Sequence, residues 1–131
     1  MDVKQQHVSS ARILMAEDNK ISGMLLSRLL ENLGHEVHWA KDGQEALEMA
    51  TDCRFDLAVV DLHMPRMDGL AFTIKYRSEE TCGARLPIIG LTGLDNKEIR
   101  QSCYAVGMDE FLLKPVDRQI LNVTIQKCLL R

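Results

Sequence analysis

The chain has 131 residues, of which 46% are hydrophobic and 27% are charged, a balance that suits one globular domain and excludes a disordered chain. Its formal net charge of −3 argues against a nucleic-acid-binding domain, which is usually basic. No apolar run reaches the ~18 residues of a membrane-spanning helix, and the polar start "MDVKQQHVSS" is not a secretory signal.

The first third of the chain predicts a tail, a strand and a helix. Residues 1–10 are polar and predict a flexible tail or the remnant of a linker, which leaves 11–131 as the domain. The short apolar run 12–16 predicts a buried strand. Leucines then recur at the i, i+3, i+4, i+7 spacing of one helix face, and Gly34 follows as a stop: Leu26, Leu29, Leu30 and Leu33.

The middle of the chain repeats this alternation. Residues 36–40 predict a second strand, and a helix begins after Asp42. The segment "LAVVD", 57–61, is apolar on both sides of the pleat, which is typical of a central parallel strand. Asp68 precedes the third helix, and we expect residues 78–86 to form a loop.

The last third adds two more strand and helix pairs. Residues 87–91 predict the fourth strand. Asp95 and Glu98 form a D-x-x-E pair, which predicts a capping box at the start of the fourth helix. Residues 110–113 predict the fifth strand, and Asp117 caps the last helix. Strict alternation of five strands and five helices predicts an α/β fold, a parallel sheet with helices on both faces.

Polar residues stand where the predicted strands end: Glu17 and Asp18, Asp61, Thr92 and Lys114. Because parallel strands end at one edge of a sheet, we expect three carboxylates, a hydroxyl and an ammonium to lie together. Clustered carboxylates repel one another, and Mg²⁺ relieves this by binding carboxylates, waters and a phosphoryl oxygen. This edge therefore has the groups for metal-assisted phosphoryl transfer.

Four motifs in this order give the chain a resemblance to the receiver domains of two-component response regulators, over residues 11–130: "MAEDN" (15–19), "VVDLHMPRMDG" (59–69), "IIGLTG" (88–93) and "GMDEFLLKPV" (107–116). Within that family, "AEDN" and "DLHMPRMDG" look most like receivers fused to hybrid sensor histidine kinases. The resemblance implies a flavodoxin-like (βα)5 fold, a doubly wound parallel sheet of five strands in the order 2-1-3-4-5.

The resemblance also implies an acceptor and its metal site. Asp61 would be the phosphoacceptor, attacking a phosphohistidine on a partner. Asp18 would bind Mg²⁺, or Mn²⁺, directly, and Glu17 would act largely through a metal-bound water. The remaining protein ligand would be the backbone carbonyl of His63, two residues after the acceptor.

Three further positions match the family's phosphoryl-binding and switch residues. Lys114 would pair with the phosphoryl group, and Thr92 would hydrogen-bond it. Phe111 stands where the family has its switch aromatic, although an ordinary core position is the alternative. Pro115 is expected to follow a cis peptide bond.

The partners follow from the resemblance. We expect a histidine kinase or a histidine phosphotransfer domain as donor, and dimerisation through the face of the fourth helix, fifth strand and fifth helix. Direct nucleic-acid or membrane contact is not expected. Ile21 and Leu25 are apolar but flank the core face of the first helix, so they are either partly buried or form a patch that docks the partner.

We expect a cytoplasmic phosphoaccepting switch rather than a turnover enzyme, and a piece of a longer hybrid kinase rather than a single-domain regulator. A phosphohydrolase on a similar sheet usually has an acid two residues after its nucleophile, where His63 stands, and a pseudo-receiver usually lacks one of the site residues. No P-loop motif is present. The cysteines lie too far apart to indicate a zinc site and suggest reduced thiols, mostly in or near the core: Cys53, Cys82, Cys103 and Cys128.

Overall fold

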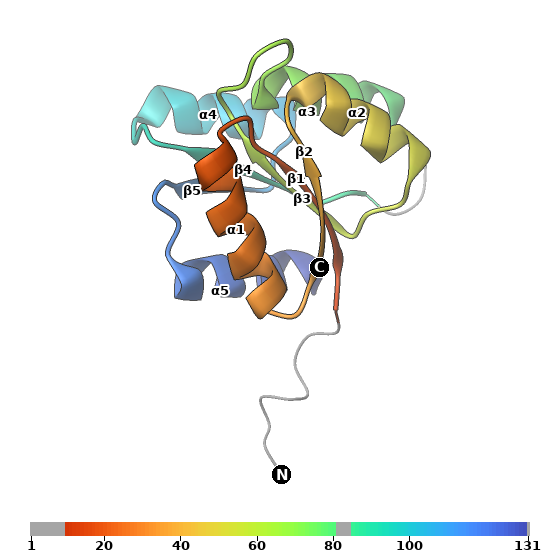
Figure 1. The fold of residues 1–131 in the computed structure, drawn as a ribbon. Helices are drawn as coiled ribbons and strands as arrows, with labels where there is room; N and C mark the ends of the chain where they lie inside the picture. Colours follow the sequence, from red (N-terminus) through yellow and green to blue (C-terminus); the bar gives the residue numbers. More distant parts are fainter. Residues whose placement is uncertain (1–9, 81–84, 131) are drawn as a thin grey trace.

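The computed structural model describes residues 10–80 and 85–130. Strands and helices alternate along the chain, as the sequence predicts (Figure 1): β1 Arg12–Ala16, α1 Lys20–Asn32, β2 Glu36–Ala40, α2 Gly43–Asp52, β3 Leu57–Asp61, α3 Gly69–Glu79, β4 Ile88–Thr92, α4 Lys97–Val106, β5 Glu110–Leu113 and α5 Arg118–Leu129. The predicted tail 1–10 lies almost wholly outside the described residues, so that boundary stays a prediction. Within the described ranges, no helix is both long and apolar enough to cross a bilayer.

The five strands form one parallel sheet in the order β2-β1-β3-β4-β5, which confirms the expected topology. The register pairs Ala16 of β1 with Val60 of β3, and Asp61 of β3 with Leu91 of β4. Thr92 at the end of β4 pairs with Leu113. The carboxyl ends of β1, β3, β4 and β5 therefore meet at one edge of the sheet, as the parallel arrangement requires.

Helices cover both faces of the sheet, with α1 and α5 on one side and α2, α3 and α4 on the other (Figure 1). Successive side chains of a strand point to opposite faces, so β1 supplies Leu14 to one core and Ile13 to the other. The α1 core face predicted from its leucines is present, with Leu26 and Leu30 buried. Every residue of β3 and β4 is buried, as expected for strands covered on both sides.

Each helix begins with an Asn or Asp whose side-chain oxygen accepts a backbone N–H from the first turn: Asn19, Asp42, Asp68, Asn96 and Asp117. Caps of this kind typically contribute about 1 kcal/mol each. The prediction that Asp95 caps α4 is wrong. Asn96 does so, accepting the N–H of Ile99 at 2.8 Å, while Asp95 accepts a hydrogen bond from the exposed Arg100.

Two predicted boundaries also move. The strand expected at 87–91 runs from Ile88 to Thr92, because Pro87 has no N–H to donate to the ladder. The loop expected at 78–86 starts later, since α3 continues to Glu79 and an ion pair between Arg77 and Glu80 supports its last turn. Residues 81–84 of that loop lie outside the described residues.

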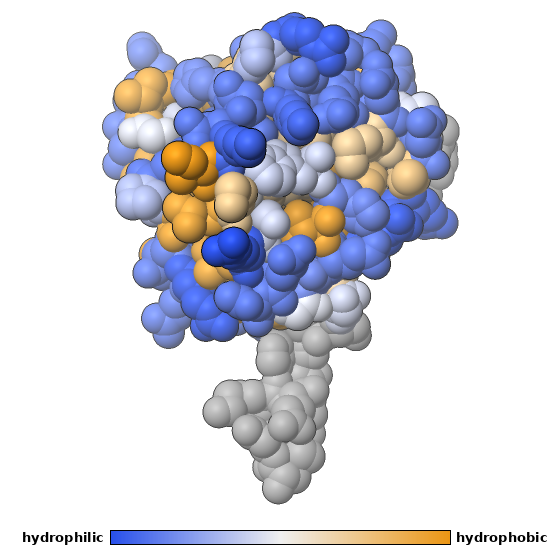
Figure 2. Space-filling view, viewed as in Figure 1, coloured by the Kyte–Doolittle hydropathy of each residue, from blue (hydrophilic) through white to orange (hydrophobic). Residues whose placement is uncertain are grey.

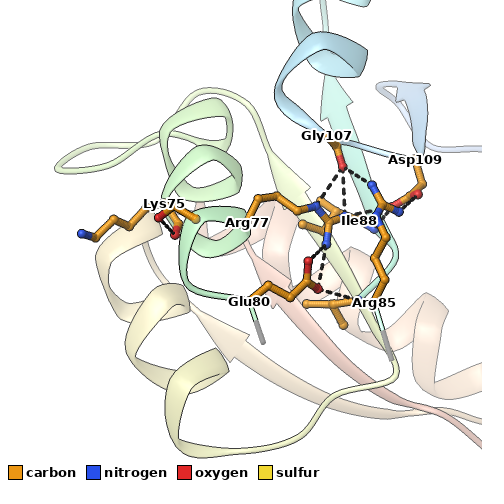
Figure 3. Close-up of polar contacts among 9 residues, drawn as sticks. Lys75, Arg77, Glu80, Arg85, Ile88, Gly107 and Asp109 are labelled. Atoms are coloured by element: carbon orange, nitrogen blue, oxygen red, sulfur yellow. Dashed lines mark hydrogen bonds and ion pairs between the residues drawn. The ribbon is translucent and has the colours of Figure 1, made fainter. Parts of the chain in front are cut away.

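A polar network joins α3 to the α4–β5 turn, away from the strand carboxyl ends (Figure 3). Arg77 donates to the carbonyl of Gly107 through Nε and Nη2, at 3.1 and 2.9 Å, and also pairs with Asp109 and Glu80. Arg85 donates to the same carbonyl and pairs with Asp109. Gly107 ends α4 with a φ of 109°, a conformation that favours glycine. The network thereby holds the C-terminal end of α4 against α3.

Candidate functional site

Two strands deliver the carboxylates predicted for the site. Glu17 follows β1 directly, and its N–H still donates to the carbonyl of Ala40 at 3.0 Å, so its backbone continues the sheet. Asp61 is the last residue of β3. Glu17 is only 1% exposed and Asp61 only 4%, whereas Asp18 is exposed. One acid of the cluster therefore faces solvent, and two are drawn into the protein.

The three acids converge. One ligand oxygen from each of Glu17, Asp18 and Asp61 lies within 4.8 Å of the others. The carboxylate of Asp18 makes no hydrogen bond or ion pair within the described part of the chain, which leaves it available. Carboxylate oxygens are the ligands that hard divalent cations prefer, so this donor set fits Mg²⁺ or Mn²⁺.

Lys114 joins this cluster from the end of β5. Its Nζ lies 2.9 Å from Oε1 of Glu17 and 2.9 Å from Oδ2 of Asp61, so one ammonium bridges two buried carboxylates. Although burial opposes its charge, the hydrogen bonds that Lys114 donates to Asp61 and Glu17 raise its pKa. The Lys114–Pro115 peptide bond is cis, as expected.

The pKa of Glu17 is raised, whereas an ion pair usually lowers the pKa of an acid. Burial raises the pKa of Glu17 and outweighs its hydrogen bonds from Lys114 and from the backbone N–H of Asn19. The nearby charge of Asp61 adds to the rise. The surroundings of Glu17 therefore disfavour its charged form, and a bound cation would favour that form.

Thr92 borders the cluster at the end of β4. It is fully buried, and its backbone carbonyl accepts the N–H of Lys114 at 2.8 Å. Its Oγ1 accepts the N–H of Leu94 at 3.1 Å, a local turn. The hydroxyl is therefore engaged within its own loop, while its backbone helps to hold Lys114.

The loop after β3 is tied to Asp61. The backbone N–H of His63 donates to Oδ1 of Asp61 at 3.2 Å, and the imidazole is exposed. Gly69 packs against the same strand end, because a Cβ at this position would lie 2.5 Å from the carbonyl oxygen of Asp61. The proposed use of the His63 carbonyl as a metal ligand stays a prediction.

Phe111 lies outside the acidic cluster. It is half-buried and lines a groove of about 480 Å³ formed by α4, β5 and α5, with the guanidinium of Arg100 5.7 Å from its ring centroid. Tyr104 and Ile120, both exposed, line the same groove. Phe111 therefore sits on the face where dimerisation is expected, and its switch role stays a prediction.

Ile21 and Leu25 are 71% and 64% exposed, so core burial does not account for them. Both lie on α1, whose N-terminus follows the acidic residues. Figure 2 shows apolar side chains gathered over and beside α1 on the face in view. Partner docking remains the explanation to test.

One contact of the site was not predicted. Trp39 of β2 donates its indole N–H to the backbone carbonyl of Glu17 at 2.8 Å. The sequence offered one signal: a single tryptophan near the end of a strand that neighbours the acid-bearing strand. Since the register of β2 on β1 was unknown, this signal did not identify the contact.

The comparisons agree with this geometry. The family model of the response regulator receiver domain matches residues 13–126. The chain is 33% identical to Histidine kinase 5 of Arabidopsis thaliana and 38% identical to the Hybrid signal transduction protein dokA of Dictyostelium discoideum, over 98% and 92% of its own length. It spans only 17% and 7% of those two proteins.

A solved structure is similar over nearly the whole chain. It is the receiver domain of the sensor histidine kinase PA1611 from Pseudomonas aeruginosa PAO1, with a magnesium ion coordinated in its active site cleft. The TM-score is 0.85 at 32% identity, covering 94% of this chain and 100% of that one.

Proposed function

Since this chain belongs to the response regulator receiver domain family, we propose that Asp61 takes a phosphoryl group from a phosphohistidine of a partner protein. The chain is a receiver domain of the kind found in histidine kinases and phosphorelays, and its acidic cluster fits a phosphoacceptor site with Mg²⁺. The observation that carries the assignment of Asp61 is its direct contact with Lys114 beside Glu17 and Asp18.

In the proposed reaction, a carboxylate oxygen of Asp61 forms a bond to phosphorus while the bond between phosphorus and the partner's histidine nitrogen breaks. The nitrogen keeps the electron pair, and the proton carried by the other ring nitrogen of the phosphohistidine makes the leaving group a neutral imidazole. Lys114 already lies against Asp61, and its ammonium compensates the negative charge of the incoming phosphoryl oxygens. The acceptor and the positive charge are therefore placed together before the donor arrives.

Glu17, Asp18 and Asp61 would hold the metal ion, with the backbone carbonyl of His63 as a further ligand. When bound, Mg²⁺ supplies charge compensation and alignment for the phosphoryl oxygens. Glu17 is buried close to Asp61, so a cation bound by both would offset the repulsion between the two carboxylates. Mn²⁺ suits the same oxygen donors.

We propose Thr92 and Phe111 as the two parts of the switch. An aspartyl phosphate adds about −1.5 to −2 charges at this edge, which gives the O–H of Thr92, whose oxygen already accepts the N–H of Leu94, a strong acceptor for its own proton. Phe111 lies on the same face of the sheet as Thr92 and would turn inward as that hydroxyl moves. The groove that Phe111 lines would then change shape, which supports a dimerisation role for α4, β5 and α5.

Ile21 and Leu25 are proposed to dock the phosphohistidine donor, either a histidine kinase or a histidine phosphotransfer domain. Their support is their exposure on the helix that follows Glu17 and Asp18. The thiols of Cys53 and Cys103 are free, which supports a reducing compartment such as the cytoplasm. Cys53 is exposed, Cys103 and Cys128 are buried, and Cys82 lies outside the described residues.

The test uses the chain with Mg²⁺ and either acetyl phosphate or beryllofluoride, followed by intact mass and NMR. The wild type should form one base-labile phosphoryl adduct per chain, and Asp61→Asn should form none. Asp52→Asn serves as the matched control, since Asp52 is exposed on α2 and outside the cluster. Asp18→Asn should also lose the response to Mg²⁺.

Other outcomes would favour the other classes. Sustained turnover of phosphomonoesters would indicate a hydrolase. A chain that responds to neither reagent would be a pseudo-receiver that acts only by binding. An adduct that persists in Asp61→Asn would contradict the assignment of the acceptor.

A further inference from the structure

The indole of Trp39 reaches across from β2 to the loop that carries the acids. Its Nε1–H donates to the carbonyl of Glu17 at 2.8 Å. That carbonyl belongs to the peptide between Glu17 and Asp18, so its direction bears on both side chains. The N–H of Glu17 is held separately, by the carbonyl of Ala40 at 3.0 Å. Strand β2 thus holds both the backbone N–H and the backbone carbonyl of Glu17.

The same indole is wedged against α1. A Cβ built on Gly23 would lie 1.9 Å from Cζ2 of Trp39 and 2.5 Å from its Cε2, so the ring occupies the space of a side chain there. Gly23 is buried, and glycine inside a helix costs about 1 kcal/mol relative to alanine. Helix α1 therefore has glycine, a poor helix former, at the position where the indole of Trp39 lies against its backbone.

The remaining contacts of the loop leave Asp18 dependent on its backbone. Glu17 is additionally held through its carboxylate, by the N–H of Asn19 at 3.0 Å and by Lys114 at 2.9 Å. Asp18 has no side-chain hydrogen bond or ion pair among the residues that the structure describes. Its carboxylate is therefore placed by the peptide that precedes it, which is the peptide that Trp39 holds.

We propose that Trp39 is a positioning residue for the divalent cation, acting through the carbonyl of Glu17, and that Gly23 provides the space this requires. The inference rests on the proposed function, because it takes the acids to be metal ligands. Groups that orient metal ligands without touching the ion commonly change affinity by 10- to 100-fold when they are removed. Trp39 is the only tryptophan of the chain, so its indole can be replaced or observed alone.

The decisive experiment replaces the N–H without changing the shape. In Trp39→3-benzothienylalanine a sulfur stands in place of the indole N–H, so the packing against Gly23 is kept and only the donor is lost. Titration of the chain with Mg²⁺ alone by calorimetry should show an affinity weaker on the order of 10-fold than that of the wild type. The free energy of unfolding, measured in urea without Mg²⁺, should change much less than this affinity does.

A control separates this effect from general loosening. Leu129 packs in the same core cluster as Trp39, on α5, so Leu129→Ala destabilises the domain without touching the loop. It should leave the affinity for Mg²⁺ close to that of the wild type. If it weakens Mg²⁺ binding as much as the benzothienyl variant does, the effect is one of stability and the proposal is wrong.

A second pair of variants tests the role of Gly23. In Gly23→Ala the new methyl group displaces the indole, and the affinity for Mg²⁺ should fall although alanine is the better helix former. In Trp39→Phe the donor is already gone and the ring is smaller. Adding Gly23→Ala to Trp39→Phe should therefore cause no further loss of affinity, and a second full loss would overturn the coupling.

The outcomes also separate this inference from the proposed function. If the wild type binds no Mg²⁺, both fail. If the wild type binds Mg²⁺, Asp18→Asn does not, and the benzothienyl variant binds like the wild type, only the role of Trp39 fails. The indole N–H resonance gives an independent signal, since it should shift on adding Mg²⁺ to the wild type and stay unchanged in Asp18→Asn.

Discussion

Lys114 Nζ lies 2.9 Å from Oδ2 of Asp61, although 53 residues separate them in the chain. The same ammonium lies 2.9 Å from Oε1 of Glu17, at a separation of 97 residues. One cation thus compensates two buried carboxylates that come from different strands. This arrangement makes the stability of the domain depend on Lys114 when no metal ion is bound.

Replacing Lys114 by methionine should destabilise the domain most without metal. Lys114→Met leaves Glu17 and Asp61 buried without their ammonium, and we expect a loss of about 2 kcal/mol at neutral pH. Added Mg²⁺ should recover part of that loss, because a ligand that binds the folded state stabilises it. Urea unfolding with EDTA and with Mg²⁺ measures both effects.

Lys127→Met is the matched control for this prediction. Lys127 pairs with Glu110 at 3.3 Å but is 60% exposed, so its loss should cost at most about 0.5 kcal/mol and be insensitive to Mg²⁺. Equal losses in the two variants would contradict the compensating role of Lys114.

Glu17 should make the stability depend on pH in an unusual direction. Because burial raises the pKa of Glu17 above 4.5, the folded state holds this proton more tightly than the unfolded state does. This contribution to stability is present below pH 4.5 and is lost as the pH rises through the folded pKa. In EDTA, the unfolding free energy of Glu17→Gln should therefore increase relative to that of the wild type as the pH rises.

The measurement is a series of urea unfolding curves from acid to neutral pH. Glu31→Gln, which changes an exposed acid of α1, controls for the loss of one negative charge. If the unfolding free energy of the wild type instead rises relative to that of Glu17→Gln as the pH rises, the hydrogen bond to Lys114 outweighs burial, contrary to our assignment.

Arg77 should contribute to stability far more than its neighbour Lys75 on α3 (Figure 3). Arg77 is 14% exposed and donates to Glu80, Asp109 and the carbonyl of Gly107, so Arg77→Met removes the guanidinium that links these three acceptors, and Arg85 continues to reach only Asp109 and Gly107. We expect a loss of about 3 kcal/mol in the unfolding free energy. Thermal and urea unfolding provide the measurement.

Lys75→Met provides the comparison within the same helix. Lys75 pairs with Glu79 at 3.2 Å on an exposed surface, where such a pair contributes about 0.5 kcal/mol or less. The phosphoryl adduct at Asp61 should still form in Arg77→Met below its melting temperature, because the network lies away from the acids. Loss of the adduct in a folded Arg77→Met chain would contradict that separation.

Charges on the exposed face of α1 should slow phosphorylation by a protein donor only. Ile21→Asp and Leu25→Asp place a carboxylate in an apolar patch, which should weaken docking by roughly 10-fold or more, since a desolvated charge costs over 1.4 kcal/mol. Phosphorylation by acetyl phosphate should keep its wild-type rate, because this donor does not need the patch.

Phosphotransfer from a phosphorylated histidine phosphotransfer protein, followed in time, gives the first rate, and intact mass gives the second. Ile74→Asp is the control, since Ile74 is 55% exposed on α3, on the other face of the sheet. If both rates fall together in Ile21→Asp and Leu25→Asp, the patch is not a docking surface.

Much of the fold follows from local sequence. The run 57–61 is apolar on both sides of its pleat and becomes the central strand β3, buried throughout. The N-cap of α4 did not follow from the local D-x-x-E pattern. Asp95 satisfies that pattern, yet Asn96 caps α4 because its own side chain meets the N–H of Ile99. Neighbouring residues with similar propensities compete, and the backbone geometry of the loop decides between them.

The chemical types of the site and their places at strand ends were determined by the sequence alone, because parallel strands end at one edge and polar residues interrupt each apolar run there. Only the tertiary structure decided their pairing. The distances from Lys114 to Asp61 and Glu17, the exposure of Ile21 and the reach of Trp39 to the carbonyl of Glu17 all depend on strand register and helix packing. Those depend on side chains far apart in the chain, which no local pattern encodes.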